Sequence, residues 1–133
     1  GGALGKKLYM RVDDIYKNNP KPQVDLDSHL DKIILEITEK RLGATAVVNE
    51  NRELVGIITD GDLRRMLHRG RNFEAITAKD IMTKNPKTID ADAMAIRAFN
   101  VMENNNITQL AVVDKNMYMG MIHLHDILKE GIV

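Results

Sequence analysis

The 133-residue chain contains one sequence pattern twice, and this repeat constrains the fold more than any other feature. Three groups of residues recur in the same order, at offsets that fall from 66 to 65 to 64 residues. They are Asp14-Ile15 with Asp80-Ile81, Ala46-Val47-Val48 with Ala111-Val112-Val113, and Gly56, Ile58 and Asp62 with Gly120, Ile122 and Asp126. Each change of offset is a one-residue deletion of the kind that loops tolerate. The repeat predicts two copies of one structural unit.

Each copy predicts the same order of elements: strand, helix, two strands and a closing helix. The first strands contain Val24 and Ile89, and apolar residues at helical spacing follow in Leu30–Ile37, with Ser28 as the N-cap, and in Ala95–Met102. Residues 44–48 with 54–58, and 110–113 with 118–122, predict hairpins, and short helices are expected at 63–67 and 124–129. The fold class is therefore α/β (α+β), with two β-α-β-β-α repeats.

Two such units are expected to pack sheet to sheet as a pseudo-twofold pair, because one unit of about 60 residues buries too little surface to be stable alone. We assign residues 12–70 to the first repeat and 71–133 to the second, linked through Arg69–Thr77. The opening Gly1-Gly2-Ala3-Leu4-Gly5 has no initiator Met, so residues 1–11 are expected to be a junction from an upstream domain.

Composition excludes several classes of protein. Lys+Arg and Asp+Glu both number 19, which argues against a nucleic-acid partner held by bulk positive charge. The chain has no Cys, which excludes disulfides and thiolate chemistry. No apolar run approaches the roughly 18 residues of a membrane span, and no signal-peptide pattern is present, so we expect a cytoplasmic protein with no membrane partner.

The stretch Gly56–Leu63 contains the most informative motif, in which an apolar strand ends in Thr59 and Asp62 follows as a helix begins. In one interpretation, Thr59 and Asp62 form a capping box that satisfies N–H groups of the first helical turn. In the other, the helix start binds an anion and the carboxylate accepts hydrogen bonds from ribose hydroxyls. The motif alone leaves both open.

The context of this motif resembles a known family. A duplicated β-α-β-β-α unit ending in V-V-D-x-x-x-x-h-G-h-h-T-x-x-D, where h is apolar, resembles the CBS domain, which occurs in pairs whose clefts bind adenosyl or other nucleotide ligands. The first copy matches through Val47-Val48 and Gly56–Asp62, and the second through Ala111–Asp114 and Gly120–Asp126. His123 replaces the Thr in the second copy, which implies two unequal sites.

Longer phrases narrow the resemblance to the C-terminal half of D-arabinose 5-phosphate isomerases. The phrases are Gly1–Leu8, Thr59–Arg65, Asp80–Thr88 and His123–Asp126. In that family a sugar-isomerase domain precedes a CBS pair, and the enzyme feeds synthesis of the sugar acid Kdo, a component of lipopolysaccharide. The resemblance implies that this stretch is not itself an enzyme, and that its regulatory ligand is a nucleotide or nucleotide-sugar such as CMP-Kdo, CMP or AMP. No catalytic cofactor is expected.

The resemblance also implies two ligand clefts. In the first, Thr59 with the N–H groups of Gly61 and Asp62 would hold an anion, and the Asp62 carboxylate would accept from a ribose diol. Small strand residues would line the base: Val24, Ala44, Thr45 and Ala46. The second cleft would use His123, Asp126 and the stretch Thr108, Gln109 and Leu110, and would bind more weakly, because an imidazole is bulkier than a hydroxyl and is charged only below about pH 6.5.

Three features have competing interpretations. A basic cluster consists of Arg64, Arg65, Arg69 and Arg71. Either the cluster is a solvated helix end, or one of its arginines faces the cleft and balances a ligand phosphate, and for that role we choose Arg64. His123 and His125 either begin a helix or bind a metal, and the lack of a third ligand favours the helix start. The pair as a whole either regulates an upstream domain or is an oligomerisation module with empty clefts that self-associates.

Overall fold

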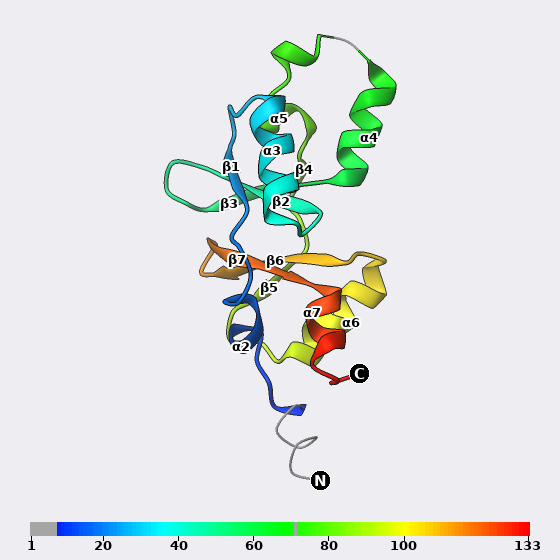
Figure 1. Ribbon diagram of the computed structural model, residues 1–133. Helices are drawn as coiled ribbons and strands as arrows, with labels where there is room; N and C mark the ends of the chain where they lie inside the picture. Colours follow the sequence, from blue (N-terminus) through cyan, green and yellow to red (C-terminus); the bar gives the residue numbers. More distant parts are fainter. Residues whose placement is uncertain (1–7, 71) are drawn as a thin grey trace.

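The structure is a computed structural model that describes residues 8–70 and 72–133, and it consists of two α/β halves stacked on each other (Figure 1). Arg71 and most of the opening Gly1–Leu8 phrase lie outside the described residues. Within the described part of the chain, none of the helices has the length and apolar character needed to span a membrane.

Each half has the order β-α-β-β-α, as the repeat predicts. The first half contains β1 (Gln23–Asp25), α3 (Leu30–Lys40), β2 (Ala44–Val48), β3 (Leu54–Thr59) and α4 (Asp60–Arg69). The second contains β5 (Thr88–Asp90), α6 (Ala95–Asn105), β6 (Gln109–Asp114), β7 (Met117–His123) and α7 (Leu124–Lys129). Four short elements accompany them: α2 (Asp13–Tyr16), η1 (Phe73–Ala75), α5 (Ala78–Ile81) and β4 (Thr83–Lys84).

The two sheets have equivalent registers. The first has the strand order β1-β2-β3-β4, and the second has the order β5-β6-β7. The first two strands of each sheet are parallel and pair Val24 with Val47 and Ile89 with Val112. The following hairpins are antiparallel. The pairing of equivalent residues confirms that the sequence repeat is also a structural repeat.

The start of α3 differs from the sequence prediction. The N-cap is His29, not Ser28, and the helix begins at Leu30. The Ser28 hydroxyl is already engaged, because it accepts a hydrogen bond from the backbone N–H of Asp25 at 2.9 Å and closes the turn after β1. The apolar face of this helix is also narrower than predicted: Ile33 and Ile37 are buried, whereas Ile34 remains 44% exposed.

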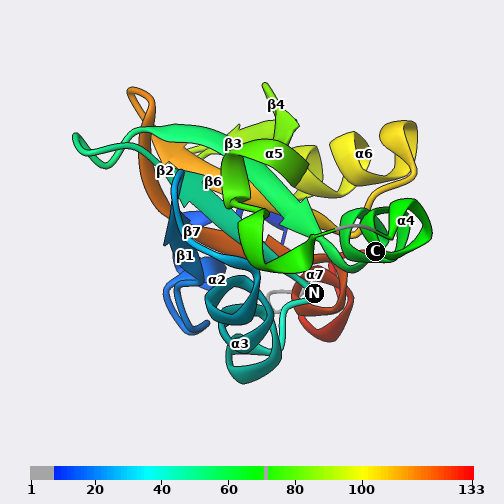
Figure 2. The same cartoon turned by 90° about the horizontal axis from the view of Figure 1, so that it is seen from above.

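The two sheets pack face to face, and Figure 2 shows them lying over one another when viewed from above. Side chains alternate across a strand, so Ala44, Ala46 and Val48 of β2 point toward the second half, while Val47 points toward α3. Small Ala side chains at this position let the sheets approach closely. The shared core consists of Leu42, Ala44, Ala46, Val48, Ile57, Ala111, Tyr118 and Met121.

Each half is completed by the segment that precedes the other half in the chain (Figure 1). Helix α2 precedes β1, yet its Ile15 and Tyr16 pack in the core of the second half with Ile122. Helix α5 precedes β5, yet Ala78 and the residues around it pack in the core of the first half. Strand β4 then adds to the edge of β3. The halves therefore exchange these short segments.

Two glycines at equivalent positions make room for the exchanged segments. A Cβ at Gly56 would lie 2.5 Å from Sδ of Met82 and 3.0 Å from the carbonyl oxygen of Thr83. A Cβ at Gly120 would lie 3.3 Å from Cδ1 of Tyr16. Because interiors are close-packed, a glycine at each of these positions gives the exchanged segment room to pack against the strand.

Candidate functional site

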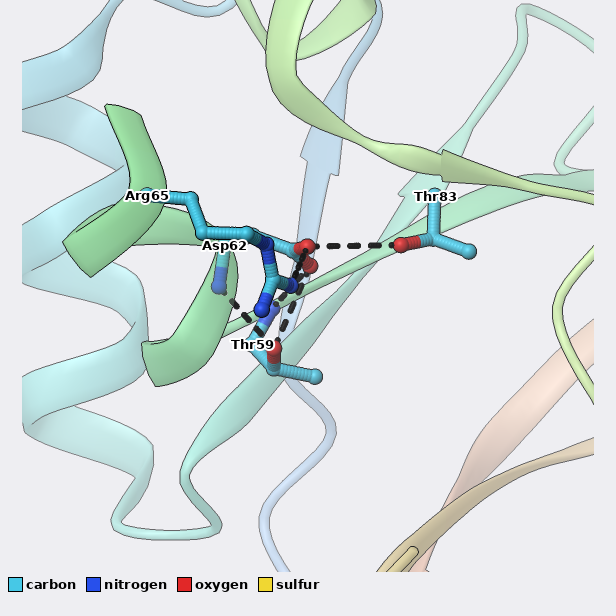
Figure 3. Close-up of polar contacts among 4 residues, drawn as sticks. All are labelled: Thr59, Asp62, Arg65 and Thr83. Carbon is cyan, nitrogen blue, oxygen red and sulfur yellow. Dashed lines mark hydrogen bonds and ion pairs between the residues drawn. The ribbon is translucent and has the colours of Figure 1, made fainter. Parts of the chain in front are cut away.

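The first candidate site is the junction of β3 and α4, where Thr59 is the N-cap (Figure 3). The Thr59 hydroxyl accepts a hydrogen bond from the backbone N–H of Asp62 at 3.3 Å, and the Thr59 N–H donates to Oδ2 of Asp62 at 2.9 Å. These reciprocal bonds form a capping box. The capping interpretation of the sequence motif is therefore confirmed.

Asp62 is also the centre of a larger polar group that the sequence did not predict. Its side chain is only 8% exposed, and its second oxygen, Oδ1, accepts from Nη2 of Arg65 at 2.6 Å and from the hydroxyl of Thr83 at 3.4 Å. Figure 3 shows these donors converging on the carboxylate from both sides. A buried carboxylate requires such partners, because an unpaired buried charge is costly.

A cavity of about 210 Å³ lies beside this carboxylate, between α4 and the exchanged segment α5–β4. Its lining includes Asp62, Arg65 and Arg69 from the first repeat, and Asp80 and Thr83 from the segment before the second. The sequence placed Arg65 in the basic cluster, but Arg64 was chosen from that cluster for the cleft, and Thr83 was missed. Thr83 could not be found from a motif within one copy, because only the exchange of segments brings it to Asp62.

The structure places the other predicted residues of the first cleft apart. Ala44 and Ala46 are buried in the core between the sheets, whereas Val24 is buried on the helix side of the same sheet. Thr45, also fully buried, bonds through its hydroxyl to the carbonyl of Ala46. Because neighbouring strand residues alternate in direction, these four do not form one wall. Arg64 is exposed, and Arg65 instead contacts Asp62.

The second candidate site, at the junction of β7 and α7, repeats the geometry with a histidine. Nδ1 of His123 accepts from the N–H of His125 at 3.0 Å, and the His123 N–H donates to Oδ2 of Asp126 at 2.7 Å. The same Oδ2 accepts from Nδ2 of Asn19 at 2.8 Å, and Asn19 also donates to the Met121 carbonyl. Asn19 belongs to the segment exchanged from the first repeat and was also missed.

The imidazole of His123 is used as a neutral hydrogen-bond acceptor at this helix start. Burial lowers the pKa of His123, the neighbouring His125 lowers the pKa further, and Asp126 opposes both. Since Nδ1 faces the helix N–H, the helix-start interpretation of this histidine is confirmed. The rings of His123 and His125 lie 4.6 Å apart between centroids.

The other residues predicted for the second cleft have separate roles. Leu110 is fully buried in the core of the second half. The Thr108 carbonyl accepts from the N–H of Leu124 at 2.8 Å, and Gln109 donates across the halves to the carbonyl of Leu42 at 3.1 Å. The backbone just before β6 therefore supports the start of α7, and the side chains of β6 mostly face the cores.

These features define a class of protein: two β-α-β-β-α modules joined through their sheets, each with a capped helix start and a carboxylate that also bonds the exchanged segment. The family model for the CBS domain matches residues 12–69 and 78–132. The chain belongs to the CBS domain family and carries a pair of its domains.

Comparison with individual proteins agrees with this assignment. The whole chain is similar to arabinose 5-phosphate isomerase KdsD from Yersinia pestis, at 39% identity over 134 residues, and from Pseudomonas aeruginosa, at 41% identity over 135 residues. The match covers 100% of this chain but 41% of each relative, so the chain spans about two-fifths of their length. The fold is also that of the CBS domain protein PAE2072 from Pyrobaculum aerophilum complexed with AMP, with a TM-score of 0.77 and 19% sequence identity. That comparison covers 88% of this chain and 89% of PAE2072.

Proposed function

We propose that this chain is the regulatory, nucleotide-binding CBS pair of a cytoplasmic D-arabinose 5-phosphate isomerase, whose catalytic domain lies outside these 133 residues. The observation that carries the proposal is the buried Asp62 carboxylate, which bonds Thr59 at the helix start and lines a polar cavity along α4. Similarity to isomerases along the whole chain supports the parent enzyme, and AMP in a solved CBS protein supports the ligand class.

The first cleft is proposed as the stronger site. Thr59 and the N–H groups of Gly61 and Asp62 would hold the anionic group, since a helix start favours negative charge. The ligand would take the place of the Thr59 hydroxyl as acceptor of the Asp62 N–H. The Asp62 carboxylate would accept from the ribose diol. The second cleft, with His123 and Asp126, would bind more weakly, because an imidazole is bulkier than a hydroxyl and because Asp126 is paired with the neutral amide of Asn19, where Asp62 is paired with an arginine.

The finer proposal is that the ligand is CMP-Kdo or a related nucleotide. An isomerase that supplies the Kdo route would gain feedback control by sensing a late, anionic product of that route. A cavity of about 210 Å³ is smaller than the roughly 300–1,000 Å³ of ligand pockets, so side chains at its rim must move to admit a whole nucleotide.

Binding to the Asp62→Ala variant tests this proposal. Loss of a charge-assisted hydrogen bond, worth roughly 1.5–3 kcal/mol, should weaken nucleotide binding about ten- to a hundredfold. Calorimetry with CMP-Kdo, CMP and AMP on the 133-residue chain measures this, and thermal unfolding reports any loss of the helix cap. Asp60→Ala, an exposed neighbour on the same helix, is the matched control and should bind as the parent does.

Two results would redirect the proposal. Unchanged binding by Asp62→Ala together with loss of binding by Asp126→Ala would assign the ligand to the second cleft. Absence of any thermal stabilisation of the parent by all three nucleotides would reject nucleotide binding, since a ligand at 100 times its Kd adds about 2.7 kcal/mol of stability.

A second candidate function is an oligomerisation module with empty clefts. The observation that favours it is apolar surface on the helical side of the first half. Ile34, Leu35 and Leu67 are 44%, 55% and 59% exposed, and a cavity of about 580 Å³ lies between the start of α3 and η1. Exposed apolar surface of this kind marks association sites, and a second copy of the chain is the proposed occupant.

A further inference from the structure

The side chain of Arg65 covers the start of α4, where the proposed anion would bind. Its Nη2 lies 2.6 Å from Oδ1 of Asp62, and its Nη1 lies 3.4 Å from where a Cβ at Gly61 would be. The absence of a side chain at Gly61 thus leaves the guanidinium room against the first helical turn. Arg65 is itself 65% exposed, so solvent surrounds most of the group that neutralises a nearly buried carboxylate.

All acceptor positions of Asp62 are occupied in this arrangement. A carboxylate has about four lone-pair positions. Oδ2 accepts from the N–H and the hydroxyl of Thr59 at 2.9 and 3.2 Å, and Oδ1 accepts from Arg65 and, more weakly, from Thr83. The Thr59 bonds belong to the helix cap. A ligand hydroxyl can therefore reach Asp62 only where Arg65 or Thr83 withdraws.

Displacement of Arg65 has a different cost for different ligands. A neutral nucleoside would replace an ion pair, in which donor and acceptor are both charged, with hydroxyl bonds in which only the Asp62 carboxylate is charged, and would leave the guanidinium without a partner. Inorganic phosphate would attract the guanidinium but would leave the 8% exposed carboxylate without a cation. A molecule that carries both a diol and an anionic group compensates for both losses at once.

A second arginine supports an anionic ligand at this place. Arg69 follows Arg65 by one helical turn and lines the same cavity. Within the described ranges 8–70 and 72–133 it takes part in none of the ion pairs, whereas Asp80 in the same wall is engaged by the N–H and hydroxyl of Thr77 at 2.9 and 3.0 Å. Once Arg65 turns from Asp62, two guanidinium groups border the cavity.

We propose that Arg65 is the specificity-determining residue of the first cleft: it exchanges Asp62 for the ligand's anionic group, so that the cleft selects nucleotides over nucleosides and over inorganic phosphate. This inference rests on the proposed nucleotide-binding function. It makes Arg65 a counterion for the carboxylate in the free protein and for the ligand in the complex.

The test measures, by calorimetry, the binding of two pairs of ligands, AMP with adenosine and CMP with cytidine, and of inorganic phosphate. Each ligand is titrated into the parent chain and into Arg65→Gln. The parent should prefer each nucleotide over its nucleoside by about ten- to a hundredfold, the range expected for one charged hydrogen bond, and should bind phosphate most weakly. Arg65→Gln should lose most of that preference, through weaker nucleotide binding and equal or tighter nucleoside binding. Arg65→Lys should keep part of it.

Arg64→Gln is the matched control, because it removes the same charge from the neighbouring exposed position and should retain the full preference. A purely structural role for Arg65 would lower thermal stability in Arg65→Gln without changing the ratio of nucleotide to nucleoside affinity, and that result overturns the inference while leaving the proposed function intact. A parent chain that binds neither member of either pair overturns both.

Discussion

At the scale of single residues, the two helix starts use the same geometry with groups of different chemistry. A Thr hydroxyl accepts the first-turn N–H in the first half, and a neutral imidazole does so in the second. The hydroxyl does not titrate near neutral pH, whereas the imidazole loses its acceptor when it is protonated. The second start is therefore sensitive to pH in a way that the first is not.

His123 should make the stability of the chain fall on mild acidification. Burial lowers the pKa of His123 in the folded chain, so as pH falls through about 6.5, the usual value, the unfolded chain takes up the proton first. This contribution to the free energy of unfolding is present above that pH and is lost toward the lower folded pKa. Urea unfolding of the parent and of His123→Thr at about pH 7.5 and 5.5 measures it.

Replacement by Thr should reduce the difference in stability between the two pH values, because a Thr at this position caps the helix as Thr59 does. The groups that face His123 are His125, which also opposes its protonation, and Asp126, which favours it. Parallel pH dependence in the parent and in His123→Thr would show that the pKa of His123 is the same in the folded and unfolded chains, and would contradict this prediction.

At the scale of elements, the exchange of α2 and α5–β4 depends on the two glycines against which these segments pack. Gly56→Ala should destabilise the chain by roughly 1–3 kcal/mol, the usual cost of overpacking, because its Cβ would meet both Met82 and the backbone of Thr83. Gly120→Ala should cost less, since its Cβ would meet only the Tyr16 ring at 3.3 Å. Chemical denaturation ranks the two; equal costs, or a larger cost at Gly120, would contradict this account.

The longer elements could be predicted because they contain enough residues to show a period in the sequence. Helix 124–129 and strand 44–48 were predicted with their observed bounds, because apolar spacing and turn residues are local signals. Helices α2 and α5 have four residues each and β4 has two, too few to show a period. Their packing depends on contacts between segments far apart in the chain, which no local pattern contains.

Separation along the chain also decides which contacts of the site could be predicted from the sequence. Thr59 and Asp62 are three residues apart, so their reciprocal bonds could be predicted from the sequence. The bond between Asp62 and Thr83 spans 21 residues, and that between Asn19 and Asp126 spans 107. Val24 was grouped with Ala46 because both are small and apolar, but the parallel pairing of β1 and β2 places them on opposite faces of the sheet.

At the scale of the whole molecule, the apolar helical face of the first half predicts self-association. Ile34 borders the cavity beside η1 and is nearly half exposed, so Ile34→Glu should place a charge in the proposed interface without disturbing the core. We expect the parent to be a dimer or larger by light scattering and Ile34→Glu to be monomeric. Lys32→Glu, an exposed change on the same helix, should associate like the parent; a parent that is strictly monomeric at high concentration rejects the proposal.

The exchange of segments also sets the order in which the molecule can be completed during its synthesis. Asn19 leaves the ribosome 107 residues before its partner Asp126, an interval of about 5–20 s at roughly 5–20 residues per second. The strands and helices of the first half, from β1 to β4, are all available earlier. We therefore expect the first half of the nascent chain to fold while the apolar side of α2 is still exposed. Helix α2 should pack into the second half only after β7 and α7 have emerged.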